Sequence, residues 1–185
     1  MRVASERGVA SRARIVEAAG RLFREHGFDA VGVDAVMHEA GLTHGGFYTH
    51  FPSKEALVAE AASAALARSA SRWEALSRDE PREAALARIV ASYLDPAHVA
   101  EPARGCLLAA LGSEVARHPT ARPGVTAAIR VMLGALTRCL PGRRRERAVA
   151  GLCTLVGAVV LARASDDPAL SAEILEAARV GVEAG

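Results

Sequence analysis

Apolar residues recur at helical spacing along most of the chain. Ile15, Ala19, Leu22 and Phe23 follow one another at i, i+4, i+7 and i+8, so they form one stripe and predict a helix over residues 11–26. No segment alternates apolar and polar residues for long enough to predict a strand. Further helices are predicted over residues 33–40, 43–50, 53–77, 81–94, 105–117, 120–140, 143–164 and 168–182, with a loop over 95–104. The predicted fold class is all-α, with about nine helices.

Between Gly41 and Ser53 the sequence holds a turn, a short helix and the start of a long helix. Gly41 suits the positive φ that ends a helix, and Thr43 is expected to cap the next one. Pro52 ends that short helix because the residue before a proline is pushed out of the α region. Ser53 caps the helix that follows. A helix this short buries little surface, so we interpret residues 32–51 as a helix-turn-helix that presents side chains to a DNA groove.

The helix that starts at Ser53 has no breaker until about Ser77. At 1.5 Å per residue it is about 36 Å long, which is enough to connect two regions rigidly. We therefore expect two domains joined through this helix. Residues 9–69 form the helix-turn-helix domain, and residues 70–185 form a second, helical domain.

The composition favours an intracellular helical protein. With 51% hydrophobic but only 4% aromatic residues, the core is expected to consist of small aliphatic side chains. The three cysteines have no CxxC spacing, which fits a reducing cytosol better than a disulfide framework. Residues 1–10 lack the apolar region of a signal peptide. The most apolar run, Ala148 to Ala162, is too short to span a bilayer, so we expect a cytoplasmic protein without a membrane segment.

Charge is distributed unevenly, although the net charge is only +2. Residues 1–24 carry six arginines against Glu6 and Glu17, which gives +4. Residues 25–53 carry four acidic residues and no Lys or Arg, which gives −4. A nucleic-acid-binding function would therefore rely on the N-terminal arm and first helix as its electrostatic footprint.

Residues 9–69 resemble the N-terminal domain of the TetR (tetracycline-repressor-like) family of bacterial transcriptional regulators. The residues that carry the resemblance are Ala13–Ala19, Leu22-Phe23, Gly27-Phe28, Glu39–Leu42 and Gly45–Leu57. The resemblance implies a homodimer whose third helix enters the major groove of a palindromic double-stranded DNA operator. It also implies C-terminal helices that form the dimer interface and enclose a pocket for a small apolar effector. A repressor released from DNA by that effector is the expected function, without a cofactor.

The resemblance also implies which residues meet DNA. The positions at which the family contacts bases and phosphates correspond to Thr43, His44, Gly45 and Gly46. The positions whose side chains reach the DNA backbone correspond to Tyr48 and His50, and a lysine that contacts a phosphate corresponds to Lys54. Gly32 stands where the family usually has a capping Ser or Thr, so we expect one phosphate contact fewer. His44 and His50 replace a frequent Lys or Arg and a frequent Tyr, which adds a pH dependence. Phe47 and Phe51 are expected to pack in the core beneath the short helix.

A second group of residues has two interpretations. Trp73, Tyr93, Cys106 and Met132 are candidates for lining the effector pocket, because aromatic residues and Met suit such pockets. Their helical spacing fits a plain core equally well. Cys106 would be a redox or electrophile sensor if it were exposed with a depressed pKa. Buried packing at the head of an apolar helix is the simpler interpretation.

The last two predicted helices have broader apolar faces than one small core needs. We predict that they pair with the same helices of a second chain and form a four-helix interface. The residues predicted to make this dimer interface are Leu152, Leu155, Val156, Val159, Ile174 and Ala178.

Other classes of function have less support in the sequence. No GxSxG, P-loop, Rossmann or paired-carboxylate motif is present, so we do not expect an enzyme. Metal-ligand spacing is absent among the cysteines and among the histidines of the first 50 residues, which are His26, His38, His44 and His50. We therefore expect no metal site. The run Arg143–Arg147 is interpreted as a solvated loop and helix start. The alternative function is a helical protein-interaction module that does not bind DNA, but this leaves the short helix unexplained.

Overall fold

The computed structural model of the protein describes residues 2–184 of the 185-residue chain, and within this range every regular element is a helix. The all-α prediction is confirmed. The α-helices are α1 (Arg2–His26), α2 (Val33–Glu39), α3 (Phe47–His50), α4 (Lys54–Asp79), α5 (Arg82–Tyr93), α6 (Pro96–Ala100), α7 (Leu107–Val115), α8 (Arg122–Cys139), α9 (Arg145–Ala164) and α10 (Pro168–Ala184). Three short 3₁₀ helices join them: η1 (His44–Gly46), η2 (Pro102–Arg104) and η3 (Pro141–Arg143).

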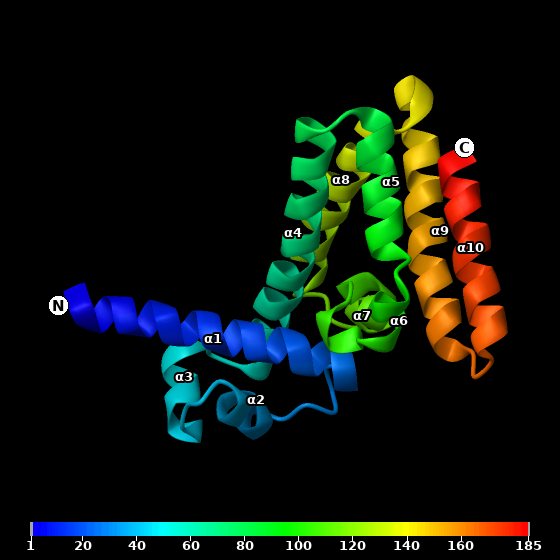
Figure 1. Cartoon of the computed structure of the whole chain (residues 1–185). Coiled ribbons are helices and arrows are strands. Elements are labelled where there is room, and N and C mark those ends of the chain that lie inside the picture. The colour runs from blue at the N-terminus through cyan, green and yellow to red at the C-terminus, as the bar shows by residue number, and fades with distance from the viewer. Residues whose placement is uncertain (1, 185) are drawn as a thin grey trace.

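The helices form two groups that share α4 (Figure 1). α1, α2 and α3 lie at one end, and the N-terminal part of α1 projects beyond the other helices. α4 rises from this group with α5 and α8 beside it, whereas α9 and α10 form an antiparallel pair on the far side. One cluster of buried residues runs through the whole arrangement. The division at residue 69 stays a prediction, and α4 crosses that position without a break.

The most extensive helix–helix packing joins α4 to α8. The buried face of α4 includes Ala61, Ala62, Ala65 and Ala70, small side chains that allow a neighbouring helix to approach closely. On α8, a Cβ atom added at Gly124 would lie 2.5 Å from Ser63 Oγ and 2.7 Å from Ser63 Cβ, both too close for real contacts. Glycine at this position therefore permits the two helices to pack as they do.

The end of α1 is fixed against α7. Gly27 has φ +91°, and its N–H donates to Phe23 O at 2.8 Å, which is the αL way of ending a helix. The next N–H, that of Phe28, donates instead to a carboxylate oxygen of Glu114 on α7 at 2.7 Å. The Phe28 ring is fully buried and meets Phe23 edge-on, with the ring centroids 5.4 Å apart. The turn after α1 thus joins the first group of helices to the second.

Two predicted boundaries were wrong. The first helix begins at Arg2 rather than residue 11, because its polar N-terminal residues continue the helix beyond the apolar stripe that marked it. The predicted loop at 95–104 contains α6 and η2. Each starts with a proline in its first turn, where the missing N–H would have no intrahelical partner anyway. Asp95 caps α6 by accepting a hydrogen bond from Ala97 N at 2.8 Å.

Helix α9 is apolar from Ala148 to Ala162, with three charged residues before this stretch and Arg163 after it. It has 20 residues and is the one helix of the described chain that is long and apolar enough to cross a membrane by length and composition alone. The apolar run lies inside this helix, whose bounds are close to the predicted 143–164. In this fold α9 packs between α8 and α10, as a core helix does.

The α4–α8 contact leads to a prediction about stability. We expect Gly124→Ala to lower the free energy of unfolding by about 1–2 kcal/mol, because Ser63 must move to admit the new methyl group. Urea unfolding followed by circular dichroism, at one fixed protein concentration, measures the change. Gly112→Ala on α7 is the matched control, since nothing lies within 4 Å of its added Cβ and a small gain is expected there. Equal effects of the two substitutions would contradict the prediction.

Candidate nucleic-acid interface

The turn of the predicted helix-turn-helix is closed by backbone hydrogen bonds. Gly41 has φ +66°, as its sequence position predicted. Its N–H donates to His38 O and the Leu42 N–H donates to Met37 O, both at 2.9 Å. This is the Schellman pattern, which satisfies carbonyl groups at the end of α2 and reverses the chain sharply. The turn therefore fixes the direction in which the next helix leaves.

The short helix after this turn begins as the 3₁₀ helix η1 and continues as α3. Thr43 does not cap it through its side chain, so that prediction was wrong. The Gly46 N–H instead donates to the Thr43 backbone oxygen at 3.0 Å, the i→i+3 bond of a 3₁₀ turn. The helix ends at His50, before Pro52, as predicted. Ser53 caps α4 by accepting from Ala56 N at 3.1 Å, which is also confirmed.

Two phenylalanines hold α3 in place. Phe47 and Phe51 are fully buried and stack with their ring centroids 5.8 Å apart. Their predicted place in the core is confirmed. Tyr48, which follows Phe47 in the sequence, is 68% exposed, and its ring meets the Phe47 ring edge-on. A helix anchored from beneath in this way presents its outer side chains to a partner outside the chain.

Most of the residues predicted to meet bases are exposed. Thr43, His44 and Gly45 lie on the surface of η1 and its N-terminal end, whereas His50 and Lys54 are half-buried. No atom lies within 4 Å of a Cβ added at Gly45, so the fold itself does not require glycine there. The open space suits the close approach of another molecule. Contact of these residues with DNA stays a prediction.

Two details limit the groups that this surface offers to a polyanion. His44 Nδ1 hydrogen-bonds to Asp34 Oδ1 on α2, so a carboxylate lies beside the imidazole. Gly32 precedes α2 in extended conformation and has no side chain that could cap the helix, and the missing phosphate contact stays a prediction. The surface of η1 and α3 therefore offers polar groups and backbone rather than permanent cations.

Arg12 is a structural residue of this region that sequence reasoning missed. Its guanidinium lies over the Phe51 ring, with Cζ 4.0 Å from the centroid. It donates from Nε to Glu60 Oε1 on α4 at 3.1 Å and from Nη1 to the His50 carbonyl at the end of α3. One side chain of α1 thus binds both α3 and α4. From the sequence we expected Arg12 to be one of the positive charges available to DNA, whereas in the fold it binds Glu60 and the His50 carbonyl.

Two further arginines of α1 are also bound within the fold, whereas two others are exposed. Arg21 pairs with Glu39 of α2 at 2.7 Å, and Arg24 donates to the Ala103 carbonyl. Arg7 and Arg14 are exposed and form no ion pair with any described residue. The charge left for a polyanion is therefore smaller than the sequence count of six arginines indicated.

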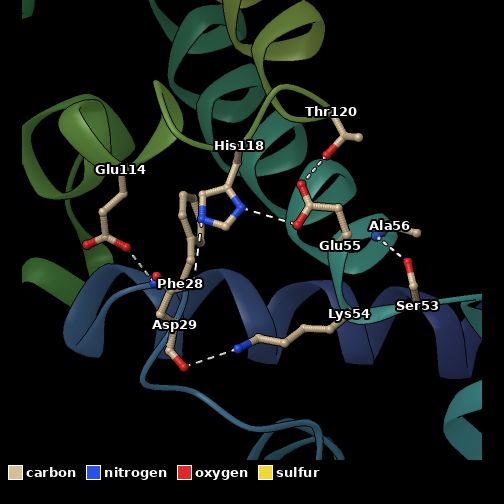
Figure 2. A network of polar contacts seen from close by, with 9 residues as sticks. All are labelled: Phe28, Asp29, Ser53, Lys54, Glu55, Ala56, Glu114, His118 and Thr120. Atoms are coloured by element: carbon tan, nitrogen blue, oxygen red, sulfur yellow. Dashed lines mark hydrogen bonds and ion pairs between the residues drawn. The ribbon is translucent and has the colours of Figure 1, made fainter.

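The first turn of α4 contacts the segment between α1 and α2 and the segment between α7 and α8 (Figure 2). Lys54 Nζ donates to the Asp29 carbonyl at 3.2 Å, in the segment between α1 and α2. The adjacent Glu55 faces the segment between α7 and α8, where it accepts from Thr120 Oγ1 and lies 3.2 Å from His118 Nδ1. The hydrogen bond from Thr120, followed by the one from His118, lowers the pKa of Glu55.

His118 adds a packing contact to this junction. Its ring meets Phe28 edge-on with the centroids 4.9 Å apart, and its Nε2 is 3.8 Å from Asp29 Oδ1. Figure 2 shows Glu114 reaching the Phe28 backbone from the other side. The end of α1, the start of α4 and the α7–α8 segment are therefore tied at one place. A shift of any one of them must disturb the others.

The candidate pocket residues do not all meet. Trp73, Tyr93 and Cys106 line one cavity of about 140 Å³ between α4, α5 and η2. Met132 is fully buried in the core and is not among the residues that line this cavity, which fits the plain-core interpretation of this residue. Cys106 is buried at the N-terminus of α7, as its packing interpretation required. No group of three His, Cys, Asp or Glu side chains that would suit a metal ion occurs in the described part of the chain.

His98 joins the two ends of this cavity. Its Nδ1 lies 2.5 Å from the Tyr93 carbonyl, and its Nε2 accepts a hydrogen bond from Cys106 N at 2.8 Å. This pair of contacts requires the neutral ring with its proton on Nδ1. Burial is the largest cause that lowers the pKa of His98. The neutral imidazole therefore holds the end of α5 to the start of α7.

The predicted dimer residues lie mostly on the inner side. Leu152, Leu155, Val159 and Ala178 are buried within the single chain, so their assignment to an intermolecular surface was wrong for this fold. Val156 and Ile174 are only partly covered. The apolar residues that α9 and α10 expose are Val149, Val160, Leu161, Leu170 and Val180. Because α9 is apolar on every side, the sequence did not distinguish its inner from its outer face.

Comparison with known proteins agrees with the helix-turn-helix. Residues 15–61 match the sequence profile of the bacterial regulatory proteins of the tetR family. The chain is 33% identical over 86 residues to YerO, an uncharacterized HTH-type transcriptional regulator of Bacillus subtilis, and 43% identical over 54 residues to YdgC of the same organism, described likewise. These matches cover 44% and 29% of this chain. They span 30% and 28% of the two relatives, less than a third of either protein.

Solved structures share the whole fold. A TetR-family transcriptional regulator from Cytophaga hutchinsonii superimposes with a TM-score of 0.79 at 19% identity, covering 96% of both chains. The reduced form of E. coli NemR gives a TM-score of 0.78 at 20% identity, covering 93% of this chain and 95% of that one. At these identities the likeness concerns the fold and not a ligand.

The contacts of Arg12 lead to a prediction about α3. We expect Arg12→Met to lower the free energy of unfolding by about 1–2 kcal/mol, because Glu60 and the His50 carbonyl lose a charged donor while the apolar contact with Phe51 is kept. Urea unfolding at fixed protein concentration measures this change. Arg7→Met is the control, since Arg7 is exposed and unpaired among the described residues. An unchanged unfolding midpoint in Arg12→Met would overturn the role assigned to Arg12.

A second prediction concerns pH. Because the folded-state pKa of His98 lies below its ordinary value of 6.5, the unfolded chain binds the proton more readily. Stability contributed by neutral His98 is therefore present above pH 6.5 and decreases as the pH falls from 6.5 towards the lowered pKa. The slope is at most about 1.4 kcal/mol per pH unit. Unfolding free energies of wild type and His98→Gln between pH 5 and 7.5 test this, and parallel curves would refute it.

Proposed function

We propose that this chain, which belongs to the tetR family of bacterial regulatory proteins, is a dimeric, sequence-specific DNA-binding transcription regulator of the cytoplasm. It acts as a repressor that leaves a palindromic operator when a small-molecule effector binds. The observation that carries the proposal is the exposed surface of η1 and α3, held from beneath by Phe47 and Phe51.

The exposed surface of η1 and α3, called the recognition surface from here on, has the features that binding in a major groove needs. Tyr48 offers an exposed hydroxyl on a rigid ring, and Gly45 leaves room for bases or phosphates. Arg14, whose Nη1 would lie 3.9 Å from a Cβ added at Gly41 in the turn, and Lys54 at the start of α4 supply positive charge beside it. Lys54 is bound only to a backbone carbonyl, so its ammonium group remains available to a phosphate. Because few basic side chains here are unpaired, we expect DNA binding that depends on base contacts as well as on charge.

Dimerisation is supported by the outer faces of α9 and α10. Leu161 is 58% exposed and Val160, Leu170 and Val180 are also exposed, which is unfavourable in a monomer. No atom lies within 4 Å of a Cβ added at Gly157, so the outer side of α9 is open to close packing. A second copy of the chain covering this surface would also supply the second recognition helix that a palindromic site requires.

Release from DNA follows from the junction at α4. Lys54 and Glu55 are adjacent, but they bind the two groups of helices on opposite sides. A tilt of α4 relative to the α7–α8 segment therefore moves α3. An effector produces this change only if it binds the DNA-incompetent arrangement more tightly.

DNA affinity tests the proposal. We expect fluorescence anisotropy to show tighter binding to DNA from upstream of the gene than to a scrambled duplex, with an affinity that falls as salt rises. Tyr48→Phe is expected to weaken binding about fivefold through loss of one hydrogen bond. Lys54→Gln should weaken binding to all duplexes and reduce the slope of log affinity against log salt by about 1.

Arg130→Gln is the matched control for Lys54→Gln. Arg130 is exposed on α8, forms no ion pair with a described residue and lies outside the recognition surface. It removes the same charge, so its DNA affinity should stay near that of the wild type. Equal losses in both variants would mean a general charge effect, and equal weak binding to both duplexes would favour the protein-interaction module. Sedimentation velocity checks that each variant remains dimeric.

A further inference from the structure

Arginines converge on two adjoining hollows between α4 and η2. The cavity beside Trp73 and a second hollow of about 170 Å³ share Arg72 and Arg104 in their linings. Arg24 and Arg68 line the second hollow. Neither lining contains an Asp or Glu. These hollows are therefore surrounded by positive charge that the lining residues do not balance.

Arg24 is the most unusual of these residues. It comes from α1, its side chain is buried with only 8% of the residue exposed, and its Nε donates to the Ala103 carbonyl at 2.9 Å. It makes no ion pair with a described residue. Burial, and next the neighbouring charge of Arg68, lower the pKa of Arg24 to about 10. A buried guanidinium paired only with a carbonyl is costly, so an anion beside it would be favourable.

Two buried polar atoms near these hollows have no hydrogen-bond partner in the described structure. The Tyr93 hydroxyl is buried beside Cys106, and no partner lies within normal hydrogen-bond geometry. Arg163 reaches Gly105 from behind, since a Cβ added there would lie 2.6 Å from Arg163 Nη2. Its Nη1 is also buried without a partner, while Nε donates to the Val99 carbonyl at 3.2 Å. Buried donors without partners commonly mark a place that a ligand or water fills.

Of the arginines that line the two hollows, Arg104 alone forms an ion pair with a carboxylate of the described chain. Glu101 is 3.5 Å from Arg104 in an exposed pair on η2. Glu17 and Glu60 line a different hollow together with Arg68, and Glu60 is already bound by Arg12. Arg24 and Arg72 therefore remain without an acidic partner among the described residues.

We propose that the cleft between α4, α5 and η2 binds a small organic oxyanion, a single carboxylate or phosphate group on an apolar body. The oxyanion lies against Arg72 and Arg104, where a planar guanidinium gives two parallel hydrogen bonds. The apolar body packs against Trp73 and Tyr93, whose rings meet edge-on at 5.5 Å. The expectation of a purely apolar effector is thereby replaced by an anionic one.

The size of the cleft limits the ligand. Hollows of about 140 and 170 Å³ are smaller than the pockets of drug-sized ligands, which measure about 300–1,000 Å³. One ring or a short chain with one charged group suits this volume. Its regulatory role rests on the proposed DNA-binding function. An anion held by Arg72 of α4 and Arg104 of η2 would fix the position of α4 relative to η2, to which Arg24 of α1 is bound through the Ala103 carbonyl.

Trp73 provides a direct measurement of the site. It is the single tryptophan of the chain, and it lines the cavity. We expect benzoate or phenyl phosphate to change its fluorescence saturably in the full-length protein, and benzyl alcohol and inorganic phosphate to do so far more weakly. Whichever of the two aromatic anions binds more tightly identifies the charged group as a carboxylate or a phosphate. Arg72→Gln should weaken that binding at least about tenfold.

Arg130→Gln, which removes an exposed arginine elsewhere, should leave the titration unchanged. A saturable change with neither aromatic anion, an equal change with benzyl alcohol, or an unaltered affinity in Arg72→Gln would each overturn the proposal. No DNA is needed for this result, so it does not depend on the regulator proposal. Anisotropy with the tighter anion then tests regulation: unchanged operator affinity at saturation would reject the effector role, whereas absence of any specific DNA binding would reject the proposed function itself.

Discussion

The close packing of α4 against α8 is the interaction on which both groups of helices depend. The alanine face of α4 and Gly124 allow the two helices to lie in contact over much of their length. As a result one rigid helix carries Lys54 beside the recognition surface at its start and Trp73 beside the cavity further along. A change at the cavity is therefore not absorbed by a loose linker between two independent units.

Local signals in the sequence predicted the recognition region well. Gly41, Pro52 and Ser53 act through their own backbone geometry or through neighbours within three residues, so their roles are legible in a short window. The predicted side-chain cap by Thr43 does not form, because a backbone hydrogen bond from the Gly46 N–H to the Thr43 carbonyl closes the 3₁₀ turn. Arg12 was missed because its partners lie 38 and 48 residues further along the chain, and no periodicity reveals them.

The second group of helices was less predictable for a physical reason. An apolar stripe identifies a helix face only when the opposite face is polar, and α9 has apolar residues on every side. Leu155 and Leu161 are alike in sequence terms, yet one is buried in the chain and the other is exposed. The clustering of Arg24, Arg72 and Arg104 was likewise invisible, because these residues come from α1, α4 and η2.

The hydrogen bonds at the start of α4 bear on how such proteins are recombined in the laboratory. Glu114, His118 and Thr120 support Phe28 and Glu55 although they follow them by more than 60 residues in the chain. A chimera joined in the middle of α4 would combine one parent's recognition helices with the other parent's α7–α8 segment. These three side chains would have to be transplanted together with the recognition helices, because a hybrid without them would lose the contact through which its two parts share a fixed orientation.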